Sequence, residues 1–203
     1  YACGYHERPP FLGPEKAKEK YDRGTKKGML PADFTREVPS SAWKWLLQYG
    51  LPYSHWKDSV GYSPKEGRLI LLVNNEFSLG RLVEDKPGPK WFNRGDAHRG
   101  AYSCGAGEST VVVEDWVSCN KVGQVTECLC LFGTAIHPCH IYFLRDKSNR
   151  PIYLWLDADK ALESRKKAAQ LEMLTGRSVA IITTEQDPKS LSINEIKEWL
   201  KLE

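Results

Sequence analysis

The 203-residue sequence has no apolar run approaching the roughly 18 residues that a membrane-spanning helix needs, and it shows no signal peptide. It also lacks a large excess of either charge, because 29 lysines and arginines oppose 26 aspartates and glutamates to leave a net charge of +3. These absences argue against a membrane protein and against attraction to nucleic acid through total charge. Any such attraction has to come from local clusters of basic side chains.

The content of 41% hydrophobic residues is sufficient for an ordinary packed core, and the length allows one large or two small domains. The chain therefore has the composition of a folded globular protein. Its first part differs, because residues 1–39 carry several prolines and the run KAKEKYDRGTKKG with little apolar periodicity. We predict that these residues form a linker or a mobile arm.

The six cysteines lack the paired Cys-x-x-Cys spacing of a zinc site. Cys128 and Cys130 flank one residue of an apolar run, and Cys119 and Cys139 lie in or beside similar strand-like runs. We predict reduced, mostly buried thiols in a cytosolic protein. Cys3 is different, because it lies near the start of a chain that begins with Tyr instead of Met. We expect upstream residues there and consider Cys3 a candidate for the last ligand of a zinc ribbon.

The first predicted helix covers residues 40–50, where Ala42, Trp45 and Leu46 recur at helical spacing, a serine can act as N-cap and Gly50 provides a stop. A short helix, two strands joined by a hairpin, and a basic loop with aromatic residues complete this half of the chain. These elements cover residues 54–61, 68–73 with 77–83, and 87–100.

From residue 109 onward, predicted strands alternate with predicted helices. The strands cover residues 109–114, 126–133, 151–159 and 177–187, and the helices cover residues 115–124, 161–176 and 192–200. The longest helix would place Leu162, Ala169 and Met173 on one face, and Ser192 and Glu195 form a capping box at the start of the last helix. This alternation predicts an α/β fold with a largely parallel sheet that helices cover on both sides.

Acidic side chains follow several of these strands. Glu114, Asp157, Asp159 and Asp187 each lie at or just past a strand end, and the two aspartates of IYLWLDADK, residues 152–160, should point the same way in an extended segment. Because the carboxyl ends of parallel strands meet at one sheet edge, we expect the four to converge. Two like charges about 4 Å apart repel by about 4 kcal/mol at an effective dielectric of about 20, so the cluster needs a cation. Mg²⁺ or Mn²⁺ suits carboxylate oxygens.

Some of these acids have a simpler explanation when each is taken alone. Asp159 precedes a predicted helix and could be its N-cap. Asp187 precedes a proline and could do no more than open a turn. Four acids at three strand ends are harder to explain in this way, so the metal site is our preferred interpretation.

The order VVVEDW, LFGTA, YLWLDADKA and TTEQDPK within residues 108–190 resembles the Toprim domain, a metal-binding catalytic module of bacterial-type primases, type IA and type II topoisomerases, and some nucleases. The preceding WLLQYGL, SVGYSPKEGRLILLV and GRLVEDKPGPKWFN resemble the N-terminal subdomain of such primases. The resemblance implies the tail of a truncated zinc ribbon and a linker in residues 1–39, a smaller mixed α+β subdomain in residues 40–105, and a Toprim catalytic domain in residues 106–203.

Carried over residue by residue, the resemblance assigns catalysis to Glu114, Asp157 and Asp159, and metal binding to these three and Asp187. The positions that it implies for nucleotide or template binding are Arg81, Lys86, Lys90, Trp91 and Arg94. Two departures stand out. Ser118 replaces an aspartate that usually follows the glutamate by four residues, and Lys189 replaces a second acid that often follows Asp-Pro. They leave open how many metal ions bind.

The activity implied by the resemblance is that of a DNA primase, which synthesises short RNA primers on single-stranded DNA by metal-dependent nucleotidyl transfer. The implied partners are single-stranded DNA, ribonucleoside triphosphates and a replicative helicase, either as a separate protein or as a C-terminal domain, since no Gly-x₄-Gly-Lys-Ser/Thr loop is present. Zn²⁺ would belong to the upstream ribbon. The expected location is the cytoplasm of a bacterial or phage-infected cell, and we expect a bacteriophage source.

Two other functions remain open at this point. One is a Toprim nuclease or strand-passage enzyme, although the sequence offers no suitable context for a nucleophilic tyrosine. The other is a non-catalytic nucleic-acid-binding module, which the reduced number of acids keeps open.

Overall fold

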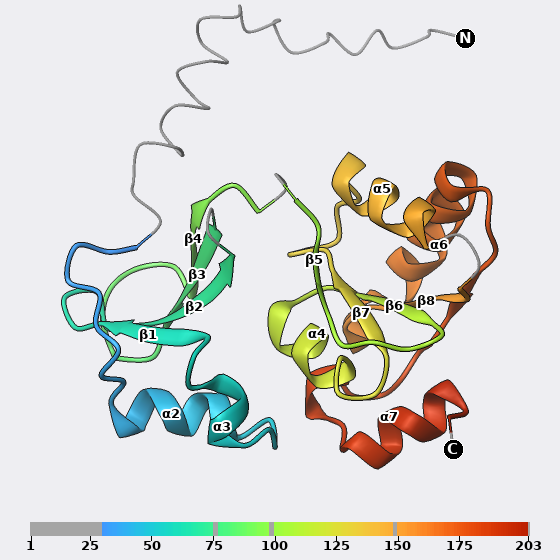
Figure 1. Cartoon of the computed structure of the whole chain (residues 1–203). Helices are drawn as coiled ribbons and strands as arrows, with labels where there is room; N and C mark the ends of the chain where they lie inside the picture. Colours follow the sequence, from blue (N-terminus) through green and yellow to red (C-terminus); the bar gives the residue numbers. More distant parts are fainter. Residues whose placement is uncertain (1–29, 75–76, 98–99, 148–149, 203) are drawn as a thin grey trace, which may run out of the picture.

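The computed structural model describes residues 30–74, 77–97, 100–147 and 150–202, and it contains two β-sheets. Sheet A is antiparallel with the strand order β1-β2-β3-β4, and sheet B has the order β5-β7-β6-β8-β9. In sheet B, β6 pairs in parallel with β7 and β8, β8 pairs in parallel with β9, and only β5 runs antiparallel to its neighbour. The fold is therefore mixed α/β with a mostly parallel second sheet (Figure 1).

Sheet A belongs to the first half of the chain. Its strands are β1 (Val60–Ser63), β2 (Arg68–Asn74), β3 (Phe77–Leu82) and β4 (Trp91–Gly95). Helices α2 (Ser40–Leu47) and α3 (Tyr53–Trp56) precede it and lie below it in Figure 1. The predicted hairpin is confirmed, because β2 and β3 pair as antiparallel neighbours.

Three predictions for this half are wrong in detail. The predicted loop of residues 87–100 contains β4, which pairs with β3 from Phe77 to Arg81. The second helix ends at Trp56, and Val60 already belongs to β1. The N-cap of α2 is Pro39, whose side chain makes no capping hydrogen bond, because a serine is already the first helical residue.

The described end of the predicted linker packs against sheet A. The backbone N–H groups of Thr35 and Tyr62 donate to each other's carbonyl oxygens at 2.9 and 2.8 Å. Phe34 lies so close to Gly61 that a Cβ at this glycine would be 2.2 Å from the ring. Asp33 accepts hydrogen bonds from Ser63 Oγ and from the N–H of Lys65. Residues 30–39 are therefore part of the folded subdomain, which the low apolar periodicity of the segment did not indicate.

Sheet B belongs to the second half of the chain. Its strands are β5 (Tyr102–Cys104), β6 (Thr110–Val113), β7 (Glu127–Cys130), β8 (Ile152–Trp155) and β9 (Val179–Ile181). Its helices are α4 (Trp116–Val122), α5 (Pro138–Asp146), α6 (Ala161–Thr175) and α7 (Ile193–Leu200), with the 3₁₀ turns η1 (Ala158–Lys160) and η2 (Pro188–Ser190). The chain changes sheets between β4 and β5, several residues before the predicted boundary at residue 105.

Helices cover sheet B on both faces, as predicted. Val111 and Val113 pack in one apolar cluster with residues of α4 and α7. Val112, on the opposite face of the same strand, packs in another cluster with residues of α5 and α6. Figure 1 shows the two pairs of helices on opposite sides of the sheet. This burial explains why β6 and β8 are apolar along their length.

The predicted ends of α6 and α7 are confirmed, whereas the predicted buried face of α6 is wrong. Ser192 and Glu195 form the predicted capping box, and Gly176 ends α6 with a φ of 71°. However, Leu162 and Met173 are 78% and 77% exposed. The buried residues of α6 are Ser164, Ala168 and Leu171, because the helix turns this narrower and less apolar stripe toward the sheet.

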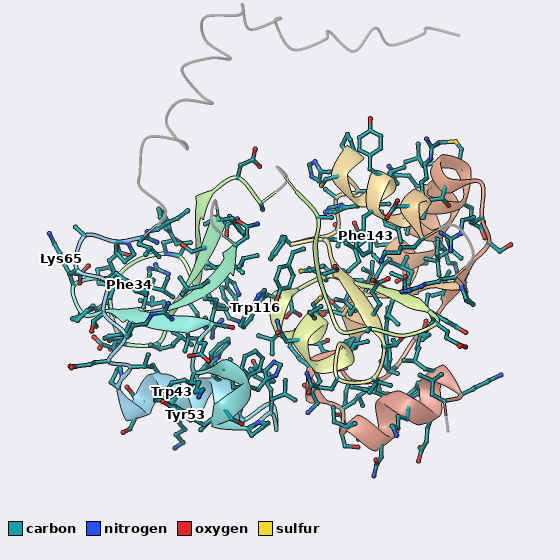
Figure 2. All side chains as sticks on the ribbon, in the orientation of Figure 1. Phe34, Trp43, Tyr53, Lys65, Trp116 and Phe143 are labelled. Atoms are coloured by element: carbon teal, nitrogen blue, oxygen red, sulfur yellow. The ribbon has the colours of Figure 1, made fainter. Side chains whose placement is uncertain are left out.

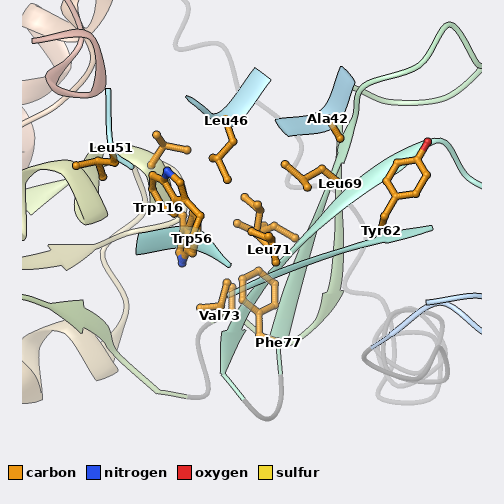
Figure 3. Close-up of a cluster of buried hydrophobic side chains, with 14 residues drawn as sticks. Ala42, Leu46, Leu51, Trp56, Tyr62, Leu69, Leu71, Val73, Phe77 and Trp116 are labelled. Carbon is orange, nitrogen blue, oxygen red and sulfur yellow. The ribbon is translucent and has the colours of Figure 1, made fainter. Parts of the chain in front are cut away.

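The two halves of the chain share a core at the start of α4. Trp116 lies on α4, yet it packs in the cluster built by Trp56, Leu71 and Phe77 of the first half (Figure 3). The rings of Trp56 and Trp116 have centroids 5.2 Å apart, and Figure 2 shows Trp116 at the centre of the molecule. Among the described residues, no helix is long and apolar enough to cross a membrane.

Replacing Trp56 by alanine should therefore destabilise the protein strongly. Trp56 is 0% exposed, so the substitution leaves a large cavity in the shared core and should reduce the free energy of unfolding by about 3–5 kcal/mol. Urea denaturation followed by circular dichroism measures this change. The control is Tyr142→Ala, because Tyr142 is 70% exposed and its loss should change stability by about 0.5 kcal/mol or less. Equal effects of the two substitutions would contradict the shared core.

Candidate active site at the carboxyl edge of sheet B

The predicted acids gather at the carboxyl edge of sheet B. Glu114 directly follows β6, Asp157 follows β8 by two residues, and Asp187 lies after β9 at the start of η2. The backbone N–H of Ala158 donates to Asp187 Oδ1 at 3.0 Å, which ties the segment after β9 to the segment after β8. The expectation that parallel strands bring these acids together therefore agrees with the geometry of the chain.

Lys189 lies at the centre of three aspartates. Its Nζ is 3.0 Å from Asp115 Oδ2, 2.9 Å from Asp157 Oδ2 and 3.0 Å from Asp187 Oδ2. Burial by itself would lower the pKa of Lys189, but the charges and hydrogen bonds of the three aspartates outweigh it and raise the pKa above the ordinary value. Burial favours a higher pKa for Asp187, but hydrogen bonds from Ala158 and Lys189 leave that pKa below its usual range.

Glu114 and Asp157 each keep one oxygen without a partner. Glu114 Oε2 and Asp157 Oδ1 are buried and have no hydrogen bond within the part of the chain that the structure describes. Burial, followed by the charge of Asp157, raises the pKa of Glu114 to about 7. Burial also raises the pKa of Asp157, against the effect of Lys189. A cation beside these two half-buried carboxylates would satisfy both buried oxygens and lower the raised pKa values.

These two carboxylates fit a divalent cation that keeps most of its coordination open. Mg²⁺ binds proteins through one or two carboxylates and fills its other positions with water and phosphate oxygens. No group of three His, Cys, Asp or Glu side chains in the described ranges is arranged to enclose a metal ion. Glu114 and Asp157 are thus the residues that would hold such an ion, and the remaining positions would be open to substrate.

Asp159 does not continue the extended segment. The backbone enters the turn η1 at Ala158, so Asp159 does not share the direction of Asp157 as the sequence suggested. Its side chain is 74% exposed and pairs with Lys160 Nζ at 3.2 Å. No side-chain capping bond is made at the start of η1 or of α6, so the alternative role of Asp159 as a simple N-cap is not seen either.

Asp115 is a site residue that the sequence analysis missed. Its Oδ1 caps α4 by accepting from the N–H groups of Val117 and Ser118, and its Oδ2 accepts from Ser118 Oγ at 2.7 Å and from Lys189. Ser118, which the resemblance places where the family has an aspartate, thus donates a hydrogen bond to a neighbouring aspartate. The position of Asp115 directly before a predicted helix was a usable signal for the cap, whereas its contact with Lys189 was not foreseeable.

A cavity of about 260 Å³ joins this edge to sheet A. The strands of sheet A and the segments after β6 and β7 both contribute to its wall, which consists of Leu79, Trp91, Asn93, Glu114, Asp115, Trp116, Phe132 and Gly133. Phe132 has a φ of 55°, which is unusual for a residue with a side chain, and its ring packs against Phe77 and Tyr102. Acids and aromatic rings therefore face the same space.

The structure divides the residues predicted to bind nucleotide or template between the two faces of β4. Trp91 lines the cavity and is 37% exposed, and the guanidinium of Arg81 stacks between Trp45 and Trp91 at 5.0 and 5.2 Å from the ring centroids. Because side chains alternate along a strand, Arg94 points to the opposite face. Trp91 and Arg81 are thus the members of this group placed beside the acids.

The other basic residues of this group lie elsewhere. Arg94 is 3% exposed and binds both oxygens of Glu66. Lys86 pairs with Glu84 at 3.0 Å and donates to the carbonyl of Pro64. Arg94 and Lys86 line a second cavity of about 310 Å³ that does not include Glu114. Lys90 is exposed just before β4.

The cysteines of the described chain are free thiols. Cys119, Cys128 and Cys130 are buried, as predicted, and burial raises their pKa values. Cys139 lies in helix α5 instead of a strand-like run and is only partly buried. Cys3, the candidate zinc ligand, lies outside the described residues.

Comparison with known proteins supports the fold. The scan against protein-family models finds no match for the sequence, and the search of curated proteins finds none either. Among solved structures, the chain is similar to the crystal structure of the Aquifex aeolicus primase, which comprises zinc-binding and RNA polymerase domains. The TM-score is 0.53 at 14% identity over 93% of this chain. The chain spans 56% of that protein's length, and the likeness shows a primase-like fold.

Replacing Glu114 by glutamine should stabilise the metal-free protein at alkaline pH. The pKa of Glu114 is about 7 in the folded chain against an ordinary 4.5, so the folded chain binds the proton more tightly than the unfolded chain. Stability should therefore fall as the pH rises from about 4.5 to about 7 and stay low above that. Discounted for partial exposure, the gain for Glu114→Gln at about pH 8 is about 1 kcal/mol, or roughly 2–4 °C in Tm.

Scanning calorimetry in EDTA at about pH 5 and about pH 8 measures this difference. The matched control is Glu108→Gln, because Glu108 is exposed. A Glu114→Gln protein whose Tm equals that of the unaltered chain at both pH values would contradict the raised pKa.

Proposed function

We propose that this chain performs primase chemistry, the template-directed synthesis of short RNA primers on single-stranded DNA. The observation that carries the proposal is the pair of unpartnered buried oxygens on Glu114 and Asp157, which lies at a strand edge beside an aromatic-lined cavity. The likeness of the fold to the Aquifex aeolicus primase supports it. In this proposal, sheet B and its helices form a Toprim-type catalytic domain and sheet A forms the N-terminal subdomain.

The acids would act on the phosphates of an incoming ribonucleotide. Glu114 and Asp157 would hold Mg²⁺ or Mn²⁺, which would supply positive charge for the phosphate oxygens while pyrophosphate leaves. An ion held there would also lower the pKa of the attacking 3′-hydroxyl, so that its proton could leave to solvent. Asp159 would add negative charge near the ion without binding it, since its charge already contributes to the raised pKa of Glu114.

Sheet A would supply the surface for the template and the nucleotide base. Trp91 offers an exposed ring face beside the acids, and stacking on aromatic rings holds bases without sequence preference. Arg81 keeps that ring in place through its stack between Trp45 and Trp91. Lys90 is exposed at the start of the same strand and can contact phosphate. On the other face, the partly exposed Lys86 would bind the template backbone farther from the acids, whereas Arg94 is buried against Glu66 and would support that face.

Substrates are ribonucleoside triphosphates and single-stranded DNA, and a replicative helicase is the expected partner. A Zn²⁺-binding ribbon that includes Cys3 would help select the template. We place the protein in the cytoplasm of a bacterial or phage-infected cell, with a bacteriophage as its source.

The test is primer synthesis from single-stranded DNA, labelled ribonucleotides and Mg²⁺. Short oligoribonucleotides are expected, and Glu114→Ala or Asp157→Ala should reduce their yield by about 100-fold or more, because each removes a charge that binds the reacting phosphates. Glu108→Ala is the matched control, and circular dichroism checks the fold. Undiminished synthesis by both site variants would reject the assignment. Metal-dependent degradation of the template in place of synthesis would identify a nuclease.

A second candidate function is a nucleic-acid-binding module without catalysis. The observation in its favour is that Lys189 already neutralises part of the acidic cluster. This module would retain single-stranded DNA equally well with Mg²⁺ or EDTA and give no extension product.

Replacing Trp91 by alanine should weaken binding of single-stranded DNA, whether the protein is a primase or a non-catalytic binding module. Loss of one stacking ring costs about 1–3 kcal/mol, which corresponds to roughly 5- to 150-fold in Kd. Fluorescence anisotropy with a labelled oligonucleotide at fixed salt measures it. The control is Trp199→Ala, since Trp199 is 49% exposed on α7 and lines no part of the cavity. The same loss in both variants would exclude Trp91 as a specific stacking platform.

A further inference from the structure

The Lys189 ammonium lies among three aspartate carboxylates, a position that would suit a metal ion. Its ammonium lies within 3.0 Å of one oxygen from each of Asp115, Asp157 and Asp187. Its side chain is 18% exposed. An ammonium has three N–H donors, so the three carboxylates use all of them. The cationic partner of these aspartates is therefore supplied by the chain itself.

The two carboxylate oxygens of Asp157 have different surroundings. Its Oδ2 binds Lys189, whereas its Oδ1 is buried without a partner, as is Glu114 Oε2. In two-metal sites, two cations about 3.5–4 Å apart are commonly served by the same set of acids. Here an ammonium already occupies one side of Asp157, and on the other side Asp157 Oδ1 and Glu114 Oε2 have no hydrogen-bond partner among the described residues.

The remaining acids agree with this division. Asp115 is committed to the N-terminus of α4 and to Ser118 in addition to Lys189. Asp187 accepts from the N–H of Ala158 in addition to Lys189. Neither Asp115 nor Asp187 has an unpartnered buried oxygen in the described chain, in contrast to Glu114 and Asp157.

We propose that this site binds one divalent cation, through Glu114 and Asp157, and that the Lys189 ammonium takes the place of a second cation among Asp115, Asp157 and Asp187. This inference rests on the proposed function for its metal ion. It also changes the expected role of Asp187, which becomes a partner of Lys189 instead of a metal ligand. Lys189 is a positioning residue, because it acts on the ion and the substrate through Asp157.

The test counts bound Mn²⁺ on the whole chain by electron paramagnetic resonance, without any activity assay. The unaltered protein should bind one Mn²⁺, and Glu114→Gln should weaken that binding at least tenfold. Lys189→Asp removes the ammonium and adds a carboxylate, so it should bind two. Lys189→Met should lose several degrees in Tm in EDTA, because three carboxylates then lack a cation, and should recover on addition of Mn²⁺ while binding two ions.

A matched control separates this effect from the general loss of a lysine. Lys147 Nζ lies 3.2 Å from Glu127 Oε1, and neither residue belongs to the candidate active site. The Lys147→Met protein should still bind one Mn²⁺, and Mn²⁺ should not restore its Tm.

The outcomes distinguish the two proposals. Two Mn²⁺ ions on the unaltered chain would overturn the role of Lys189 and leave the proposed metal-dependent function intact. No bound Mn²⁺ would overturn the proposed function together with the inference. A count of one that persists in both Lys189 variants would show that the ammonium does not fill a cation position.

Discussion

The contact of Lys189 with three aspartates holds together the segments that follow three strands of sheet B. Asp115 comes after β6, Asp157 after β8, and Lys189 itself after β9, so one side chain links parts of the chain up to 74 residues apart. A buried charge without its partner costs several kcal/mol, so each of these loops depends on the others for its position. Glu114, which directly precedes Asp115 of this network, lines the cavity between the sheets.

A second constraint is the shared core at Trp116. This residue starts the helix that Asp115 caps, and it packs among apolar side chains of sheet A. Asp115 and Trp116 thus connect the acidic cluster with the subdomain that contains β4. As a result, Trp91 and Glu114 line a single cavity although they belong to different sheets. The proposed chemistry needs this junction, because phosphates and base must be held together.

Much of the fold followed from local patterns in the sequence. The alternation of strands with helices after residue 109 reflects hydrogen bonding and burial that neighbouring residues determine, and the capping box at Ser192 and Glu195 involves positions three residues apart. Strand β4 was missed because both of its faces line cavities, so Trp-Phe-Asn-Arg shows no apolar alternation. The exposed face of α6 was misjudged because its most apolar residues are not the ones that touch the sheet.

The sequence by itself determined that acids stand at the ends of neighbouring parallel strands, because strand direction brings those ends to one edge. Only the tertiary structure decided how the charges pair: Lys189 with three aspartates, Asp159 turned toward Lys160, and Glu114 and Asp157 each left with an unpartnered oxygen. It also separated Trp91 from Arg94 across β4. The physical reason is that charge pairing acts over a few ångströms in space, and the sequence does not state which distant loops will come that close.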